Sequence, residues 1–143
     1  MILKLLPKQI PVFWEAIKTG AVQADEVDSK DLQPYLNELL HSLLSDKAQC
    51  FIVLDRNRVL ISLLVTRVQV DKITGHKYLL LQILYVWEKM EDVTWVDALS
   101  LVRQFANKEQ CRYLLFNSRN SAIWDRTKRY GFIEKTRTYS LKV

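Results

Sequence analysis

The hydrophobic positions along the chain change their spacing several times, and each change marks a new predicted element. Residues 78–86 are almost all apolar but too few to span a membrane, which predicts a strand near the centre of a sheet, covered on both faces. After residue 93, apolar side chains recur at three- and four-residue steps, as an amphipathic helix requires. Thr94 and Asp97 have the spacing of a capping box, so this helix is predicted to begin at Thr94.

The first third of the chain predicts one strand and two helices. Residues 1–6, followed by a proline, form a short apolar run that indicates a strand. Residues 9–18 and 32–44 each place apolar side chains on one helical face. Gly20 is expected to end the first helix, and the small and acidic residues 21–30 are expected to form a loop.

The middle of the chain predicts three antiparallel strands in succession. Residues 50–54 and 59–70 are mostly apolar and flank a polar turn at residues 55–58, which predicts a hairpin. A second turn, at residues 71–77, contains a glycine and leads into the central strand at residues 78–86. A meander is therefore expected.

The last third predicts a strand, a helix and a final strand. Residues 112–116 are a short apolar strand, and a strand-helix-strand step of this length usually makes the two strands parallel neighbours. Residues 122–130 predict a short helix capped by Gly131, because glycine accepts the left-handed backbone conformation at a helix C-terminus. Residues 133–143 alternate in a pattern that predicts a strand.

Length and composition indicate an ordinary globular protein. The chain has 143 residues, of which 49% are hydrophobic, so it can bury a core without disulfides or a metal, and one domain over residues 1–143 is expected. No window reaches the roughly 18 apolar residues of a membrane helix. We therefore expect a cytoplasmic protein without a membrane partner.

Cysteine and histidine are too few to indicate a metal site or a catalytic triad. Cys50 and Cys111 each precede an apolar run, where a buried, reduced thiol is the simplest interpretation. His41 and His76 have no Cys or carboxylate at ligand spacing, so no metal is expected. The three glycines are too widely spaced for a P-loop or a GxGxxG motif.

The net charge of +5 is concentrated near the C-terminus. Residues 103–143 contain ten Lys or Arg and three acidic residues, so this segment carries +7 and the rest of the chain −2. The asymmetry fits an anionic ligand such as a nucleotide cofactor, and it also fits an ordinary solvated face. The rings and cations around Trp124 are typical of single-strand binders, but Trp124 is expected in the core and nucleic acid is not the expected partner.

The order of these elements, together with the sequence NSAIWDRTKRYGF at residues 120–132, resembles the GNAT (Gcn5-related N-acetyltransferase) superfamily over nearly the whole chain. Asn120, Gly131 and Phe132 keep the spacing of the family's C-terminal helix. The resemblance implies an α+β fold with a mixed, mostly antiparallel sheet of about six to seven strands flanked by about four helices. It also implies an N-acyltransferase with acetyl-CoA as cofactor and an amine or a protein as acceptor.

The resemblance places the cofactor contacts at the end of the central strand, at the start of the next helix and around the last helix. The residues at these positions are Tyr85, Val86, Trp87, Lys89, Thr94, Trp95, Asn120 and Arg126.

The chain departs from the family in the loop at residues 87–93, WEKMEDV. Active members carry glycines in this loop, whose backbone amides wrap the cofactor's diphosphate. Here there is no glycine, and Glu88, Glu91 and Asp92 outnumber the one base, Lys89. A carboxylate repels a close phosphate by about 1 kcal/mol in wet surroundings, so these residues disfavour diphosphate binding in the usual manner.

The sequence does not identify the acid and base of an acyl transfer. Many members have a Tyr in the last helix where this chain has Thr127, whose hydroxyl is a poor acid near neutral pH, and Tyr130 lies three residues further on. Glu88 and Glu91 follow the central strand, where a carboxylate can deprotonate an amine through water. Glu88, Glu91 and Tyr130 are the catalytic candidates, although solvated loop acids are the simpler interpretation of the two glutamates.

A second hypothesis is a GNAT-like module that binds a protein without catalysis, which the missing glycines and Thr127 also fit. Segments such as FANKEQC at residues 105–111 and RYGF at residues 129–132 look like the small GNAT-like proteins encoded by tailed bacteriophages and prophages. That resemblance implies a protein of the virion or the host cytoplasm, with a protein partner either in the phage particle or in the host. The oligomeric state stays open in both hypotheses.

Overall fold

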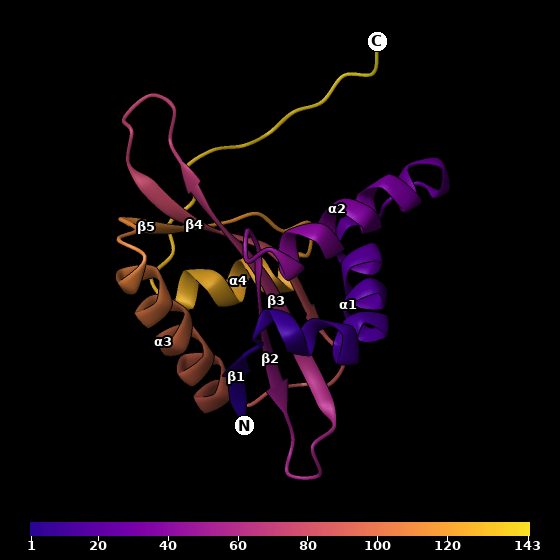
Figure 1. Ribbon diagram of the computed structural model, residues 1–143. Coiled ribbons are helices and arrows are strands. Elements are labelled where there is room, and N and C mark those ends of the chain that lie inside the picture. Colours follow the sequence, from indigo (N-terminus) through magenta and orange to yellow (C-terminus); the bar gives the residue numbers. More distant parts are fainter.

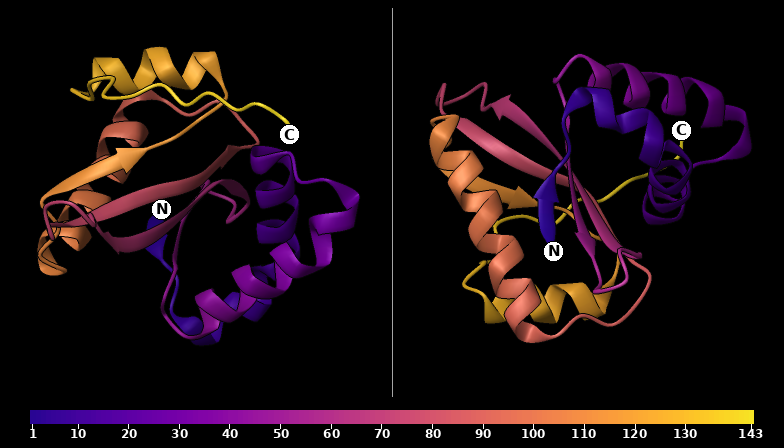
Figure 2. Two further views of the ribbon diagram at one scale, coloured as in Figure 1. Left: turned by 90° about the horizontal axis from the view of Figure 1, so that it is seen from above. Right: turned by 60° about the horizontal axis from the view of Figure 1, so that its bottom comes forward.

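The chain folds into a five-stranded sheet with α1 and α2 on one face and α3 and α4 on the other (Figures 1 and 2). The computed structural model describes residues 1–143. Two 3-10 turns, Pro7–Gln9 and Ser29–Asp31, precede α1 and α2. The strands and helices are β1 Ile2–Lys4, α1 Ile10–Asp25, α2 Leu32–Leu44, β2 Gln49–Leu54, β3 Leu60–Val70, β4 Lys77–Val86, α3 Asp92–Lys108, β5 Tyr113–Phe116 and α4 Ser121–Arg129.

The strands lie in the order β1-β2-β3-β4-β5. All neighbours are antiparallel except β4 and β5, which are parallel. The predicted meander and the parallel strand-helix-strand step are therefore confirmed, as is the α+β class. The strand predicted to be central, at residues 78–86, is β4, and it lies next to the edge of the sheet. The middle strand is β3.

The predicted strand at residues 133–143 is wrong, which reduces the sheet to five strands instead of six to seven. The segment has no regular secondary structure and runs away from the sheet, as the yellow trace of Figure 1 shows. Ile133 and Leu141 are 79% and 89% exposed. A strand needs a pairing partner for its backbone groups, and β5 does not provide one here.

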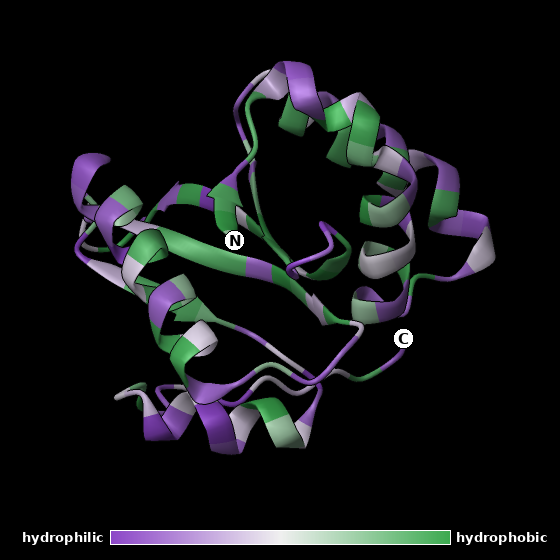
Figure 3. Cartoon of the chain, turned by 90° about the horizontal axis from the view of Figure 1, so that it is seen from below, coloured by the Kyte–Doolittle hydropathy of each residue, from purple (hydrophilic) through white to green (hydrophobic).

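Apolar side chains form one cluster on each face of the sheet. In Figure 3 the strands are mostly green, whereas green and purple segments alternate along the helices. The cluster under α1 and α2 includes Ile17, Leu39 and Ile52, which are fully buried. The cluster under α3 includes Leu79 and Val102. The apolar run of β4 reflects this burial on both faces, as its sequence predicts.

A bulge at Gln82 exchanges the two faces of β4. Val65 of β3 is opposite Ile83, but Thr66 is opposite Leu81, so Gln82 has no partner across the strand pair. Leu81 therefore packs under α3, whereas Ile83, two residues on, packs under α1 and α2. The continuous apolar run concealed this switch.

Gly20 does not end the first helix, which continues to Asp25. A Cβ atom at this glycine would lie 3.2 Å from Leu63 Cδ2, 3.2 Å from Tyr85 Cβ and 3.4 Å from the Trp87 ring. The glycine therefore lets α1 approach the end of β4 closely. As a result, residues 21–25, predicted as loop, are helical and lie beside the end of β4.

The predicted capping box is also wrong, because α3 begins at Asp92 with Glu91 as its N-cap. Thr94 and Asp97 already lie within the helix, and the Thr94 N–H donates to the Glu91 carbonyl at 3.0 Å. The cap of α4 is confirmed: Gly131 has φ +94°, and the Phe132 N–H donates to the Thr127 carbonyl.

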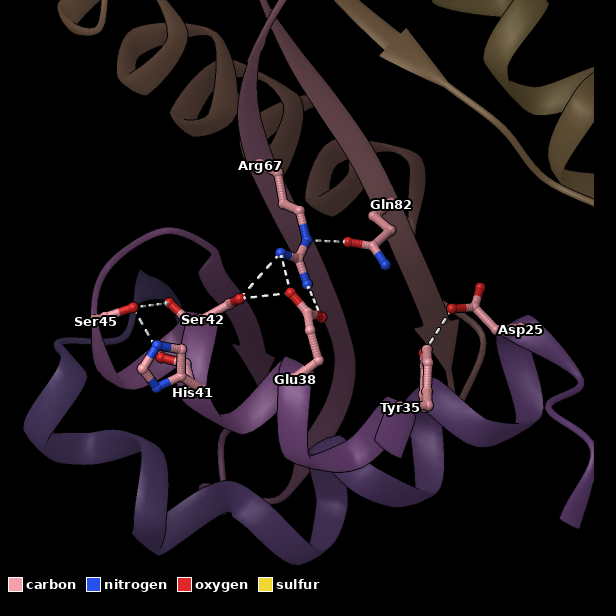
Figure 4. A network of polar contacts seen from close by, with 8 residues as sticks. All are labelled: Asp25, Tyr35, Glu38, His41, Ser42, Ser45, Arg67 and Gln82. Carbon is pink, nitrogen blue, oxygen red and sulfur yellow. Dashed lines mark hydrogen bonds and ion pairs between the residues drawn. The ribbon is translucent and has the colours of Figure 1, made fainter. Parts of the chain in front are cut away.

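Arg67 of β3 joins α2 to the bulge of β4 (Figure 4). Its guanidinium donates to both carboxylate oxygens of Glu38, at 2.9 and 2.8 Å. It also donates to Gln82 Oε1 at 2.6 Å and to Ser42 Oγ at 3.1 Å. Because the Arg67 side chain is only 15% exposed, these bonds are needed to satisfy its charge.

Replacing Gly20 tests the close approach of α1. Gly20→Val is expected to lower the free energy of unfolding by about 2 kcal/mol, because the added Cβ atom already meets Leu63 and Tyr85 and the side chain adds further bulk there. Thr19→Val, exposed on the same helix, is the control and should change stability by less than about 0.5 kcal/mol. Urea denaturation measures both, and equal stability of the two variants would contradict the packing described.

Glu38 should make stability depend on acid pH. Hydrogen bonds from Arg67 hold the pKa of Glu38 below its ordinary value of 4.5, so its contribution is complete above that pH and is lost as the pH falls through the lowered pKa. Glu38→Gln should cost about 1 kcal/mol at pH 7 and progressively less below pH 4.5. Denaturation at several pH values checks this, with Glu15→Gln, an exposed acid of α1, as the control. A pH-independent difference would refute it.

Candidate functional site

The strands β4 and β5 separate beyond the bulge and leave a cleft between them. Their pairing runs from Tyr78 opposite Tyr113 to Leu81 opposite Phe116 and then stops, while β4 continues to Val86 with β3 alone. In the left view of Figure 2 the orange strand β5 diverges from β4 toward the right. The cleft has a volume of about 570 Å³. Its lining residues are Gln23, Ala24, Asp25, Glu26, Leu80, Gln82, Leu84, Tyr85, Val86, Phe116, Asn117, Ser118, Arg119, Asn120 and Ile123.

Two acids from the end of α1 lie on one wall of the cleft, and one base lies on the opposite wall. Asp25 is the last residue of α1, and Glu26 follows it in a left-handed conformation with φ 50°. Arg119, in the loop between β5 and α4, bonds to the Glu26 carboxylate at 3.0 Å. Their side chains are 69% and 70% exposed, so this ion pair joins the walls only weakly.

Asp25 is held by Tyr35 of α2, whose hydroxyl donates to Asp25 Oδ2 at 2.6 Å (Figure 4). Burial, and then the Asp25 carboxylate, raise the pKa of Tyr35 above its ordinary value. Tyr35 therefore stays protonated and keeps Oδ2 as an acceptor. No side chain or backbone group donates to the other oxygen, Oδ1, which leaves it available to a ligand.

The loop on the opposite wall is fixed by the start of α4. The Asn120 side chain accepts from the Ala122 N–H at 2.9 Å, which caps the helix. Ser118 accepts from the Asn120 N–H with its hydroxyl and from the Trp124 indole N–H with its carbonyl. Trp124 serves this loop and is 48% exposed, so its predicted place in the core is wrong.

A second polar cluster lies at the start of α3, where α4 packs against it. Arg126 donates to the Asp92 carboxylate at 2.8 Å and lies over the Trp95 ring, 4.9 Å from its centre. The Tyr130 hydroxyl donates to the same carboxylate at 3.2 Å. Hydrogen bonds from Arg126 and then Tyr130 lower the pKa of Asp92, so this acid stays ionised.

The cleft suits the pantetheine arm of an acyl-CoA but the start of α3 does not suit its diphosphate. From Gln82 to Val86, β4 has no strand partner on the β5 side, so its edge can pair with the amide groups of an extended arm. At α3, the N–H groups of Thr94 and Trp95 already donate to the Glu91 carbonyl. Asp92 also places a carboxylate at the first turn, where a phosphate would need positive charge.

The structure separates the predicted cofactor residues into three groups. Tyr85, Val86 and Asn120 line the cleft. Trp95 and Arg126 belong to the cluster at the start of α3. The other three lie apart from the cleft lining: Trp87 packs edge-on against Tyr85, Lys89 is exposed, and Thr94 is in the first turn of α3.

The three predicted catalytic candidates do not line the cleft. Glu88 and Glu91 are exposed in the loop before α3. Tyr130 bonds to Asp92 and Arg126 instead. The sequence missed Asp25 and Glu26 because Gly20 was expected to end α1 five residues earlier.

Metal and membrane sites have no counterpart in the fold. No group of three or more His, Cys, Asp or Glu side chains is placed to share a metal ion. No helix has both the length and the apolar character to cross a membrane. Both cysteines are free, and burial raises the pKa of the Cys50 thiol to about 12, which makes it unreactive.

Solved acetyltransferases share this architecture, although no protein-family model and no curated sequence matches the chain. A GNAT family acetyltransferase from Staphylococcus aureus matches with a TM-score of 0.63 and 12% identity, over 100% of this chain and 98% of that one. The chain has the GNAT fold. A ribosomal-protein-alanine N-acetyltransferase from Brucella melitensis biovar Abortus 2308 gives a TM-score of 0.67 and 14% identity, over 100% and 99% of the two chains. The aminoglycoside N-acetyltransferase AAC(6′)-Iy in complex with CoA gives 0.68 and 14%, over 100% and 98%.

Substitution of Asn120 tests how the loop of the GNAT-fold cleft is held. Asn120→Ala is expected to lower the free energy of unfolding by about 1 kcal/mol, because the α4 cap is lost. Asn120→Asp keeps an acceptor for the Ala122 N–H and should stay close to the original protein. Urea denaturation compares them, and equal losses in the two variants would show that capping is not the role of this side chain.

Proposed function

We propose that the protein is an N-acyltransferase that uses an acyl-CoA, acetyl-CoA in the simplest case, to acylate an amine. The observation that carries the proposal is the cleft where β4 and β5 separate, with a carboxylate held at its wall by α1 and α2. The GNAT-fold structures to which the chain is similar include an acetyltransferase in complex with CoA, which supports the same function.

The donor would lie along the exposed edge of β4. The amine nitrogen would form a bond to the thioester carbonyl carbon of the acyl-CoA, the C–S bond would break, and the departing thiolate would take a proton from water and leave as the free thiol. Gln82 to Val86 can hold the arm of the donor through their backbone groups, while Asn117 to Asn120 close the opposite side. Tyr85 and Val86 keep the cofactor-binding role proposed for them from the sequence, and Asn120 contributes by fixing the loop.

The acceptor would enter beside the end of α1. An ammonium group is attracted by the carboxylates of Asp25 and Glu26, and it must lose a proton before its nitrogen can attack. Asp25 Oδ1 can accept that proton because Tyr35 occupies only Oδ2. Asp25 is thus our choice for the general base in place of Glu88 and Glu91.

An acetyl-transfer assay tests this assignment. The protein should release free thiol from acetyl-CoA in the presence of a suitable primary amine, such as a diamine, a lysine peptide or a peptide N-terminus. Asp25→Asn should lower kcat/KM about 100-fold, because the base is removed while the shape is kept. Glu15→Gln, on the exposed side of the same helix, should have no effect.

Two results would contradict the proposal. Activity of Asp25→Asn within about twofold of the original would remove Asp25 as the base. Absence of both turnover and CoA binding would instead favour a GNAT-fold protein that binds a protein partner without catalysis. The acids of the loop before α3 are the observation that favours this second function.

A further inference from the structure

The cleft borders a second pocket, which lies between the sheet and the helices α3 and α4. Leu84, Phe116 and Ile123 line both the cleft and a neighbouring apolar pocket of about 90 Å³. This pocket also contacts Trp95, Arg126 and Tyr130. A donor whose arm follows β4 would therefore direct its other end toward these side chains.

The first turn of α3 already contains a negatively charged side chain, that of Asp92. Asp92, in the first turn of the helix, receives a hydrogen bond from Arg126 at 2.8 Å and another from Tyr130 at 3.2 Å. Arg126 is fixed from a second side by its contact with the Trp95 ring, and its side chain is only 21% exposed. The guanidinium that contacts Asp92 directly is thus paired and held in place, while Arg129 acts on Asp92 only through its charge.

The remaining charges near this end are mostly negative. Glu88 and Glu91 are exposed in the loop, and Lys89 is the only base among residues 87–93. None of these residues is a glycine that could bring bare amides close to a phosphate. A nucleotide diphosphate would find Arg126 already paired, with only the exposed Lys89 and Arg129 as free cations, and it would meet the carboxylates of the same region.

We propose that the protein recognises its acyl donor through the pantetheine arm alone, with the Asp92–Arg126–Tyr130 cluster filling the place where a diphosphate would bind. Thioesters of pantetheine that carry no nucleotide are then donors as good as the corresponding acyl-CoA. This inference rests on the proposed function, because it specifies the donor class of the same cleft.

Comparison of two donors tests it. The value of kcat/KM for acetyl-pantetheine should lie within about threefold of that for acetyl-CoA. Calorimetry should give a dissociation constant for pantetheine within about threefold of that for CoA. This measurement does not depend on turnover. A preference for CoA of more than about tenfold in either experiment would overturn the inference.

Removal of the Asp92 carboxylate should make the protein prefer CoA to pantetheine. Asp92→Asn frees Arg126 and removes one negative charge, so it should increase the affinity for CoA about tenfold over that for pantetheine. Asp97→Asn, an exposed acid of the same helix, removes the same charge away from Arg126 and should leave the ratio unchanged. An unchanged ratio in Asp92→Asn, with the fold verified by circular dichroism, would refute the role of the ion pair.

The outcomes separate this inference from the proposed function. Turnover of acetyl-CoA alone would support the N-acyltransferase and overturn pantetheine recognition. Turnover of both donors with kcat/KM values within about threefold of each other would support both. Binding of neither CoA nor pantetheine would overturn the proposed function and the inference with it.

Discussion

The cleft depends on the bulge at Gln82, because the bulge changes the direction of β4 at the point where β5 leaves it. Before Gln82, β4 is paired on both sides and contributes Leu81 to the core under α3. After it, β4 pairs only with β3 and contributes Ile83 to the opposite core. Because of this one inserted residue, β4 contributes side chains to both cores, and its edge beyond the bulge has no strand beside it.

Polar contacts hold this irregular point in place. Arg67 binds Gln82 with one side of its guanidinium and Glu38 of α2 with the other. The same helix supplies Tyr35, which fixes Asp25 at the wall of the cleft. The position of the proposed base therefore depends on how α2 is attached to the sheet, even though α2 contributes no residue to the cleft lining.

The two ends of the cleft differ in their electrostatics. At the end of α1, Asp25 keeps a free oxygen and Glu26 has only an exposed ion pair, so a cation can bind there. At the start of α3, Arg126 and Asp92 neutralise each other before any ligand arrives. This difference is the basis of the proposals that the site takes an amine acceptor at the first end and does not recognise a nucleotide at the second.

The sequence predicts most of the fold but little of the site, for physical reasons. The spacing of hydrophobic residues identifies the meander and the parallel step to β5, and the glycine identifies the cap at Gly131, because each depends on a local pattern. The bulge is hidden because both faces of β4 are buried, so apolar residues occupy nearly every position. Gly20 misleads because its role is a contact with Leu63 and Tyr85, which are distant in sequence.

Site residues were missed for the same reason. Asp25 lines the cleft only because α1 runs past Gly20, and Tyr35 bonds to Asp25 only because α2 packs beside α1. The pairing of Asp92 with Arg126 joins residues 34 positions apart, which no local pattern records. The alternation of side chains along residues 133–143 predicted a strand, but the segment has no strand to pair with and stays irregular.

Mapping the bound donor on the protein tests the central claim most directly. Backbone amide NMR shifts, followed during titration with CoA or pantetheine, should change for residues 82–86 of β4 and residues 116–123 around the opposite loop. Shifts confined to other segments, such as residues 133–143, or no shifts with either compound, would contradict a donor site between β4 and β5.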